Sequence, residues 1–262
     1  MIKTLSNIFL LCLCALVASC NLVTGNAEGD GDADSTDEDS LGLEELDLYT
    51  EAVIPEAADE LFDDFLFSYV SSQSFRDERT KTGNESLSLT EDQSVIVIYE
   101  READLELQKD TSLVHVLLEK IEWDNEMIEL YDFNRLHGQW FLTGDSINEV
   151  SNTPNASFLV FLKDFITDSL YQHESLKLPV LFKYYSEDEE QTITRHIDYD
   201  EWNELVNDLP DMSEEVINID YGQSLISTNR KSVLLKGLSN GLLITFHFDF
   251  SNGRWRLFEI ES

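Results

Sequence analysis

Two polar side chains near the C-terminus could act together in acid–base chemistry. Residues 244–250 alternate apolar and polar side chains, which is typical of a strand with one buried face. His247 and Asp249 would then project from the face opposite the aromatic one, with Arg254 or Arg256 across a hairpin. A His–Asp pair in a concave sheet can transfer protons. The alternative, which the sequence favours, is a solvated or interdomain face with surface ion pairs.

A second group of candidates could contact a ligand. Tyr184, Tyr185 and Trp202 could line a ligand cleft, and Arg254 and Arg256 could contribute to binding. Aromatic side chains are more often part of a hydrophobic core. Core packing is therefore the favoured interpretation of the three aromatic residues.

The remaining sequence contains no further catalytic or metal-binding pattern. The five histidines have no H-x-x-x-H or carboxylate-bridged spacing, so no metal site is predicted. Neither a G-x-S-x-G motif, a phosphate-binding loop nor a dinucleotide-binding fingerprint is present. The sequence therefore predicts no cofactor and favours a protein that is not an enzyme.

The N-terminus predicts secretion and lipidation. Lys3 is followed by an apolar run over residues 8–17 and by small residues, the order of a secretory signal. The run is shorter than the roughly 20 residues that a membrane-spanning helix needs. Val17-Ala18-Ser19-Cys20 matches a lipobox, so we expect residues 1–19 to be removed and Cys20 to carry lipid. A plain secreted protein is the alternative.

Lipidation of Cys20 would leave no free thiol. The other cysteines, Cys12 and Cys14, lie in the predicted leader. The mature chain would then have no disulfide, cysteine nucleophile or thiolate metal site.

The next segment and the net charge restrict the partners. Residues 21–51 contain no lysine or arginine and are rich in Gly, Ser, Asp and Glu, so we expect residues 20–52 to form a disordered tether. The whole chain carries a net charge of −36. Nucleic-acid binding is excluded because phosphates require a basic face. The lipid alone would hold the protein at the outer membrane, facing either the periplasm or the cell surface.

From about Val53 onward the sequence repeats one pattern. Aromatic residues at i, i+3 and i+7 follow Pro55 and again Pro154, and the same offset aligns Phe75 with Tyr171. Later, Asp-Phe, a short turn and G-x-W-x-L occur at residues 132–142 and 249–257. A third match relates residues 121–124 to residues 197–200. Three matches in one order predict an internal duplication.

The duplication predicts the fold and the domain boundaries. We expect an α+β fold of two tandem cone-shaped domains, residues 53–150 and 151–262, with a seam at residues 151–155. Each domain would have N-terminal helices packed on a curved antiparallel sheet. The second copy has a long segment before its last hairpin that the first copy lacks.

The lipobox, the acidic segment, the paired F-x-x-F-x-x-x-[FY] helices and the G-x-W-x-L strands resemble a family of Bacteroidetes lipoproteins of unknown function. The resemblance covers residues 53–262 and implies tandem domains like nuclear transport factor 2. The resemblance implies no catalytic residues for this chain. We therefore expect an envelope lipoprotein that binds a small molecule, glycan or protein without catalysis. The alternative is a hydrolase or isomerase that uses His247 and Asp249.

Overall fold

The computed structural model describes residues 60–84, 87–90, 92–226 and 229–262. All of them belong to one compact unit, Val53–Ser262. The predicted leader, Cys20 and the acidic segment lie outside the described residues. None of the described helices combines the length and apolar character needed to cross a membrane.

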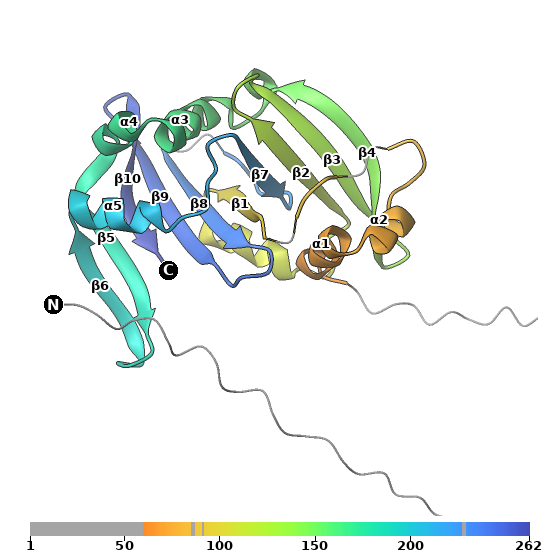
Figure 1. The fold of residues 1–262 in the computed structure, drawn as a ribbon, viewed down its shortest axis with the longest axis horizontal. Helices are drawn as coiled ribbons and strands as arrows, with labels where there is room; N and C mark the ends of the chain where they lie inside the picture. Colours follow the sequence, from red (N-terminus) through yellow and green to blue (C-terminus); the bar gives the residue numbers. More distant parts are fainter. Residues whose placement is uncertain (1–59, 85–86, 91, 227–228) are drawn as a thin grey trace, which may run out of the picture. The chain divides into compact units, whose positions relative to one another are not determined.

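Short groups of helices lie between groups of strands along the described chain (Figure 1). The helices are α1 (Phe62–Ser71), α2 (Gln73–Arg79), α3 (Ala156–Thr167), α4 (Ser169–Glu174) and α5 (Tyr199–Asn207), with 3-10 helices η1 (Glu102–Lys109) and η2 (Val150–Asn152). The strands are β1 (Ser94–Tyr99), β2 (His115–Glu122), β3 (Met127–Leu136), β4 (Gln139–Glu149), β5 (Leu176–Ser186), β6 (Gln191–Ile197), β7 (Glu215–Asp220), β8 (Arg230–Gly237), β9 (Leu243–Ser251) and β10 (Arg254–Glu261).

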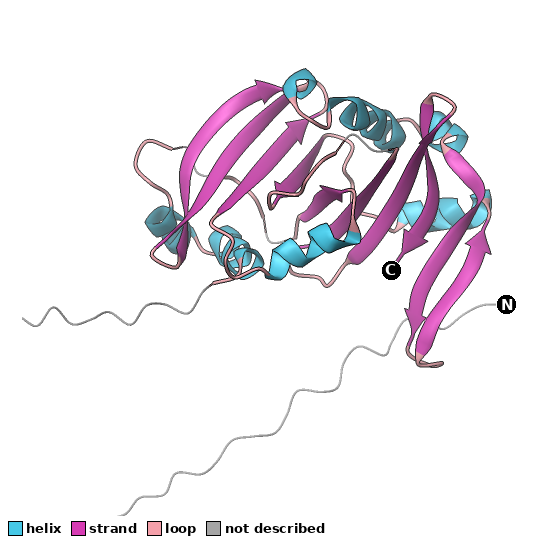
Figure 2. Ribbon diagram, turned by 180° about the vertical axis from the view of Figure 1, so that it is seen from behind, coloured by secondary structure: helices cyan, strands magenta, loops and turns pink. Residues whose placement is uncertain are grey.

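All described strands belong to one ten-stranded sheet with the order β4-β3-β2-β7-β1-β8-β9-β10-β5-β6. The predicted α+β class with helices packed on a curved sheet is confirmed (Figure 2). The expectation of separate antiparallel sheets is wrong, because β1 pairs in parallel with β7, and β10 pairs in parallel with β5. The division into tandem domains at residue 150 stays a prediction.

The parallel pair β1–β7 lies between two matching sets of strands. On one side β7 pairs with β2, followed by β3 and β4. On the other side β1 pairs with β8, followed by β9 and β10. Each half of the chain therefore places one strand beside the strands of the other half.

The central strands supply side chains to two hydrophobic cores. Successive side chains of a strand point to opposite faces. Val95, Val97 and Tyr99 of β1 pack with α1 in one core, here called the α1 core. Ile96 and Ile98 pack with α3 and α5 in another, the α3 core. The two cores therefore lie on opposite faces of the sheet, and Figure 1 shows α1 and α3 near different ends of it.

The two cores repeat the same ring contacts. In the α1 core, Phe62 lies 5.4 Å from Phe133 and 5.2 Å from Trp140, between ring centroids. In the α3 core, Phe158 lies 5.6 Å from Phe248 and 5.1 Å from Trp255. The predicted match of Phe75 with Tyr171 is also confirmed: their rings lie 5.9 Å from Phe65 and 6.1 Å from Phe161, respectively.

The structure corrects two details of the repeat. Phe248, rather than Phe250, corresponds to Phe133, because each is seven residues before its tryptophan across a turn with two positive-φ residues. Phe250 instead is 40% exposed. Residues 121–124 and 197–200 are not equivalent either, since Ile121 lies in β2 and Ile197 in the edge strand β6.

The extra segment of the second half forms β5, β6 and α5. β5 joins the sheet beside β10, and β6 pairs with β5 at the edge. α5 begins with a capping box, in which the Asp198 side chain accepts from the Glu201 backbone N–H and Glu201 accepts from the Asp198 backbone N–H. This segment places Trp202 in the α3 core.

A buried polar contact joins the central strands. Asn218 of β7 accepts a hydrogen bond from the Ile98 backbone N–H at 3.1 Å and donates to the Glu119 carboxylate at 2.7 Å. Burial raises the pKa of Glu119, and the hydrogen bond from Asn218 only partly offsets this effect. The charged form of Glu119 therefore destabilises the fold.

We predict that Glu119→Gln changes the pH dependence of stability. The folded protein holds the Glu119 proton at higher pH than the unfolded chain, whose ordinary value is 4.5. The free energy of unfolding of the wild type should therefore fall relative to the variant as pH rises from below 4.5 through the folded-state pKa. Urea unfolding at a series of pH values measures this difference. The prediction is contradicted if the free energy of unfolding of the wild type minus that of the variant is constant or rises with pH. Glu187→Gln, the same substitution at an exposed position, is the control.

Candidate functional site

A cavity of about 200 Å³ lies in the α3 core between helices α3 and α5 and the sheet. Its lining is mostly apolar. Six of the residues that line it are Leu162, Phe165, Trp202, Val206, Met212 and Phe246. For comparison, an apolar cavity of about 150 Å³ in another protein stays dry and binds benzene. The cavity can therefore hold a small apolar molecule.

Trp202 is fixed on one wall of the cavity. Its side chain is buried, and its indole N–H donates to Gln172 Oε1 at 3.1 Å. Gln172 in turn donates to the Phe165 carbonyl at 2.9 Å. These bonds join α5 to α4 and to the end of α3, so the tryptophan ring has a defined orientation beside the cavity.

The segment after α5 forms another part of the lining. Leu209, Pro210, Asp211, Met212 and Ser213 all line the cavity. The Met212 carbonyl accepts from the indole N–H of Trp123 at 2.9 Å, which anchors this segment to the core.

Asp211 is the only lining residue in the described chain that ionises. Its side chain is exposed, and hydrogen bonds from the Ser213 hydroxyl and backbone N–H lower the pKa of its carboxyl. Asp211 is therefore a solvated acid at the edge of the cavity, with no second ionisable group to share a proton.

The structure separates the predicted ligand contacts. Trp202 lines the cavity, as expected. Tyr184 and Tyr185 do not line the cavity, because both lie on β5, and no residue of that strand is part of the lining. Tyr184 is near Phe182, with 5.4 Å between their stacked rings, and Tyr185 is 60% exposed.

The two arginines also lie away from the cavity. Arg254 is exposed at the start of β10. Arg256 lies opposite Asp249 in the β9–β10 register. Since Trp255 and Leu257 of the same strand belong to the α3 core, Arg256 points to the other face.

His247 and Asp249 project from the face opposite Phe246 and Phe248, as expected. They have different partners. Asp249 accepts from Lys177 Nζ at 3.0 Å and from the Ser251 hydroxyl at 3.3 Å. His247 Nδ1 is 2.7 Å from Ser232 Oγ. No hydrogen bond joins His247 to Asp249 among the described residues, so the predicted acid–base pair has no direct contact to support it.

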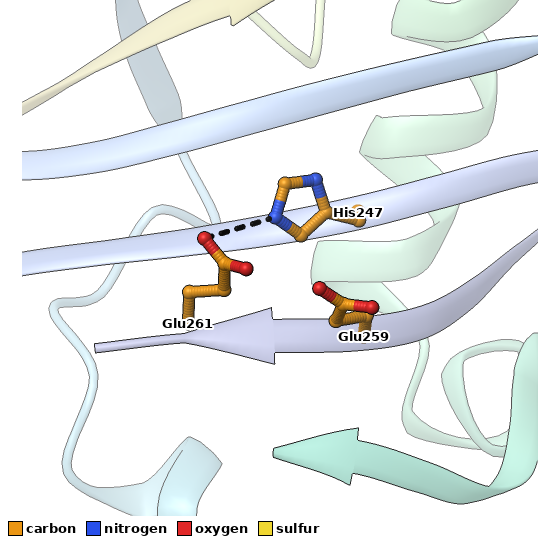
Figure 3. Close-up of side chains that lie close together, drawn as sticks. All are labelled: His247, Glu259 and Glu261. Carbon is orange, nitrogen blue, oxygen red and sulfur yellow. Dashed lines mark ion pairs between the residues drawn. The ribbon is translucent and has the colours of Figure 1, made fainter. Parts of the chain in front are cut away.

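Sequence reasoning missed two sets of residues. Val206 of α5 and Met212 of the segment after it line the cavity, and the signal for α5 was the Asp198–Glu201 capping box before Trp202, Leu205 and Val206. Glu259 and Glu261 lie close to His247 (Figure 3), Lys183 pairs with both carboxylates, and no spacing in the sequence indicates this group.

Comparisons with known proteins place this fold in a family. Residues 85–262 match the family described as "Domain of unknown function (DUF4348)". The chain belongs to the DUF4348 family. A crystal structure of an NTF2-like protein from Bacteroides fragilis is similar to this DUF4348 protein, with a TM-score of 0.68 and 26% sequence identity. The match covers 78% of this chain and 96% of that one. The search of curated proteins found no match.

The comparison supports part of the family resemblance seen in the sequence. The DUF4348 match and the NTF2-like neighbour support an NTF2-like family of unknown function. These two matches give no information about lipidation or about tandem domains. The cavity described above lies within the matched residues.

We predict that the Trp202 ring, more than its N–H, stabilises this DUF4348 protein. Trp202→Ala should lower the free energy of unfolding by about 3–5 kcal/mol because it enlarges the cavity. Trp202→Phe should cost less, about 1–3 kcal/mol, since Gln172 Oε1 loses its donor while a ring remains. Urea unfolding measures both values. Equal losses for the two variants would contradict the prediction.

Proposed function

We propose that this protein is a non-catalytic binding module that takes a small apolar molecule in the cavity of the α3 core. The observation that carries the proposal is the cavity of about 200 Å³, whose lining is apolar except at Gln172, Asp211 and Ser213. Binding sites for small molecules are typically concave and apolar with a few polar groups. A hydrolase or isomerase using His247 and Asp249 remains the alternative.

The polar groups of the cavity define the ligand further. Gln172 already uses its carbonyl for Trp202 and its amide for Phe165. A bound molecule would therefore gain mainly from burial of its apolar surface, about 25 cal/mol per Å². A compact ring system with at most one polar group matches this lining best.

We predict that indole binds the cavity and that Val206→Phe abolishes the binding. Val206 lies on α5 and lines the cavity, so a phenyl ring there would fill the space. Indole at about 100 times its dissociation constant should stabilise the wild type by about 2.7 kcal/mol, measured as a rise in melting temperature.

The matched control is Val160→Phe, the same substitution at a position of α3 that is 55% exposed. This variant should keep the shift caused by indole. Calorimetric titration provides an independent measure of binding to each variant. Absence of a shift in the wild type, or an undiminished shift in Val206→Phe, would contradict the proposed function.

We also propose that the protein is a lipoprotein of the outer membrane, held through Cys20. The support is the Val17-Ala18-Ser19-Cys20 motif, together with the acidic composition of the segment that follows. Two acyl signals give stable anchoring, whereas a single chain binds only reversibly. The acidic segment would then separate the folded unit from the anionic membrane surface.

We predict that Cys20→Ser moves the protein out of the membrane fraction. Serine has no thiol to accept the diacylglycerol, so labelled palmitate should no longer be incorporated. Fractionation of cells that express each form, followed by immunoblotting, measures the change. A Cys20→Ser protein that stays in the membrane fraction would refute the anchor.

We further propose that the two halves of the folded unit are tandem copies of one NTF2-like domain that have exchanged their strands β1 and β7. The strand order is symmetric about this pair, since β2, β3 and β4 mirror β8, β9 and β10. The repeated ring contacts of Phe62 and Phe158 support the same origin.

A further inference from the structure

Three side chains that can bind a metal meet on the polar face of β9 and β10. His247 of β9 lies opposite Glu259 of β10 in the strand register, and Glu261 follows two residues later on the same face. Figure 3 shows the imidazole and the two carboxylates close to one another on this face. The site is separate from the apolar cavity, because none of the three residues lines it.

The distances suit a small cation. One ligand atom from each residue lies within 4.8 Å of the others, and His247 Nε2 is 3.7 Å from Glu261 Oε2. Zinc binds nitrogen and oxygen ligands at about 2.0–2.2 Å, so two ligands of a tetrahedral ion lie about 3.4 Å apart. Small rotations of the two glutamate side chains would close the remaining gap.

His247 is oriented for coordination. Its Nε2 atom is buried and has no hydrogen-bond partner among the described residues. Its Nδ1 atom lies 2.7 Å from Ser232 Oγ. If Nδ1–H donates to that hydroxyl, Nε2 carries the lone pair and faces Glu261. A metal-binding histidine usually donates its other N–H to such a partner, which fixes the ring.

A lysine now neutralises part of the carboxylate charge. Lys183 Nζ donates to Glu261 at 2.9 Å and also to Glu259. One ammonium leaves the pair of carboxylates with a net charge of −1, whereas a divalent cation would neutralise it. The Lys183 side chain is 34% exposed, so its end can move into solvent when a cation takes its place.

We propose that His247, Glu259 and Glu261 bind a divalent first-row transition metal ion such as Zn²⁺. One imidazole nitrogen and two carboxylate oxygens are ligands that zinc and its neighbours accept. Three protein ligands leave a fourth position for water or an oxygen ligand. The ion replaces the Lys183 ammonium as the cation beside the Glu259 and Glu261 carboxylates.

Zinc titration of the full chain tests the proposal. Calorimetry should show one equivalent of Zn²⁺ bound more tightly than the weak binding common to a chain with 53 acidic residues. His247→Ala and Glu259→Gln should each lose this tight equivalent. Ser232→Ala should weaken it about 10-fold, because the imidazole loses its orienting partner. Lys183→Met should strengthen it, since the competing ammonium is gone.

The control is His115→Ala. His115 Nε2 also lies beside a carboxylate, 3.0 Å from Asp132 Oδ1, but both side chains are about half exposed and no third ligand joins them in the described chain. This variant should bind zinc like the wild type. Circular dichroism of each variant shows whether it is folded.

A second measurement does not depend on loss of binding. Co²⁺ in place of zinc should give visible absorption bands of a four-coordinate site in the wild type and in Lys183→Met. Equal zinc affinity of the wild type and a folded His247→Ala would overturn the proposal. Weaker binding to Lys183→Met than to the wild type would do the same.

Discussion

The parallel pairing of β1 with β7 is the constraint on which the rest of the structure depends. The two strands come from different halves of the chain, and each continues the sheet of the other half. Both are buried on both faces, so their apolar runs, Val95–Tyr99 and Val216–Ile219, are nearly continuous. The exception is Asn218, whose side chain satisfies the Ile98 N–H and contacts Glu119.

The two faces of the sheet that this central pair helps to form carry different kinds of site. Because β1 and β7 contribute side chains to a hydrophobic core on each face, α1 packs on one face and α3 and α5 pack on the other. At the β8–β10 end, the helix-covered face holds the apolar cavity. The opposite face of the same strands carries His247, Glu259 and Glu261, partly accessible to water. An apolar ligand and a metal ion would therefore bind on opposite sides of strand β9.

Local patterns predicted much of the fold and less of the site. Helical aromatic spacing located α1 and α3, and alternation located β9. The alignment of Phe250 with Phe133 was wrong because it matched a dipeptide rather than the distance from the turn. The order of strands could not be predicted, since β1 and β7 exchange places through contacts about 120 residues apart along the chain. Trp202 was a candidate from its residue type, whereas its neighbours in the cavity come from three helices, four strands and the segment after α5.

By itself, the sequence determined which faces of the helices and strands are apolar, where the hairpin turns lie, and that the chain is strongly acidic. Each of these properties depends on residues within a few positions of one another. Only the tertiary structure decided which strands are neighbours, and so which side chains meet. His247 contacts Glu261 because the β9–β10 register and the bulge after Leu257 bring them to one place. The cavity and the proposed cation site each form where side chains that are distant in sequence meet on one face of the sheet. The spacing of residues along the sequence does not show which side chains meet in this way.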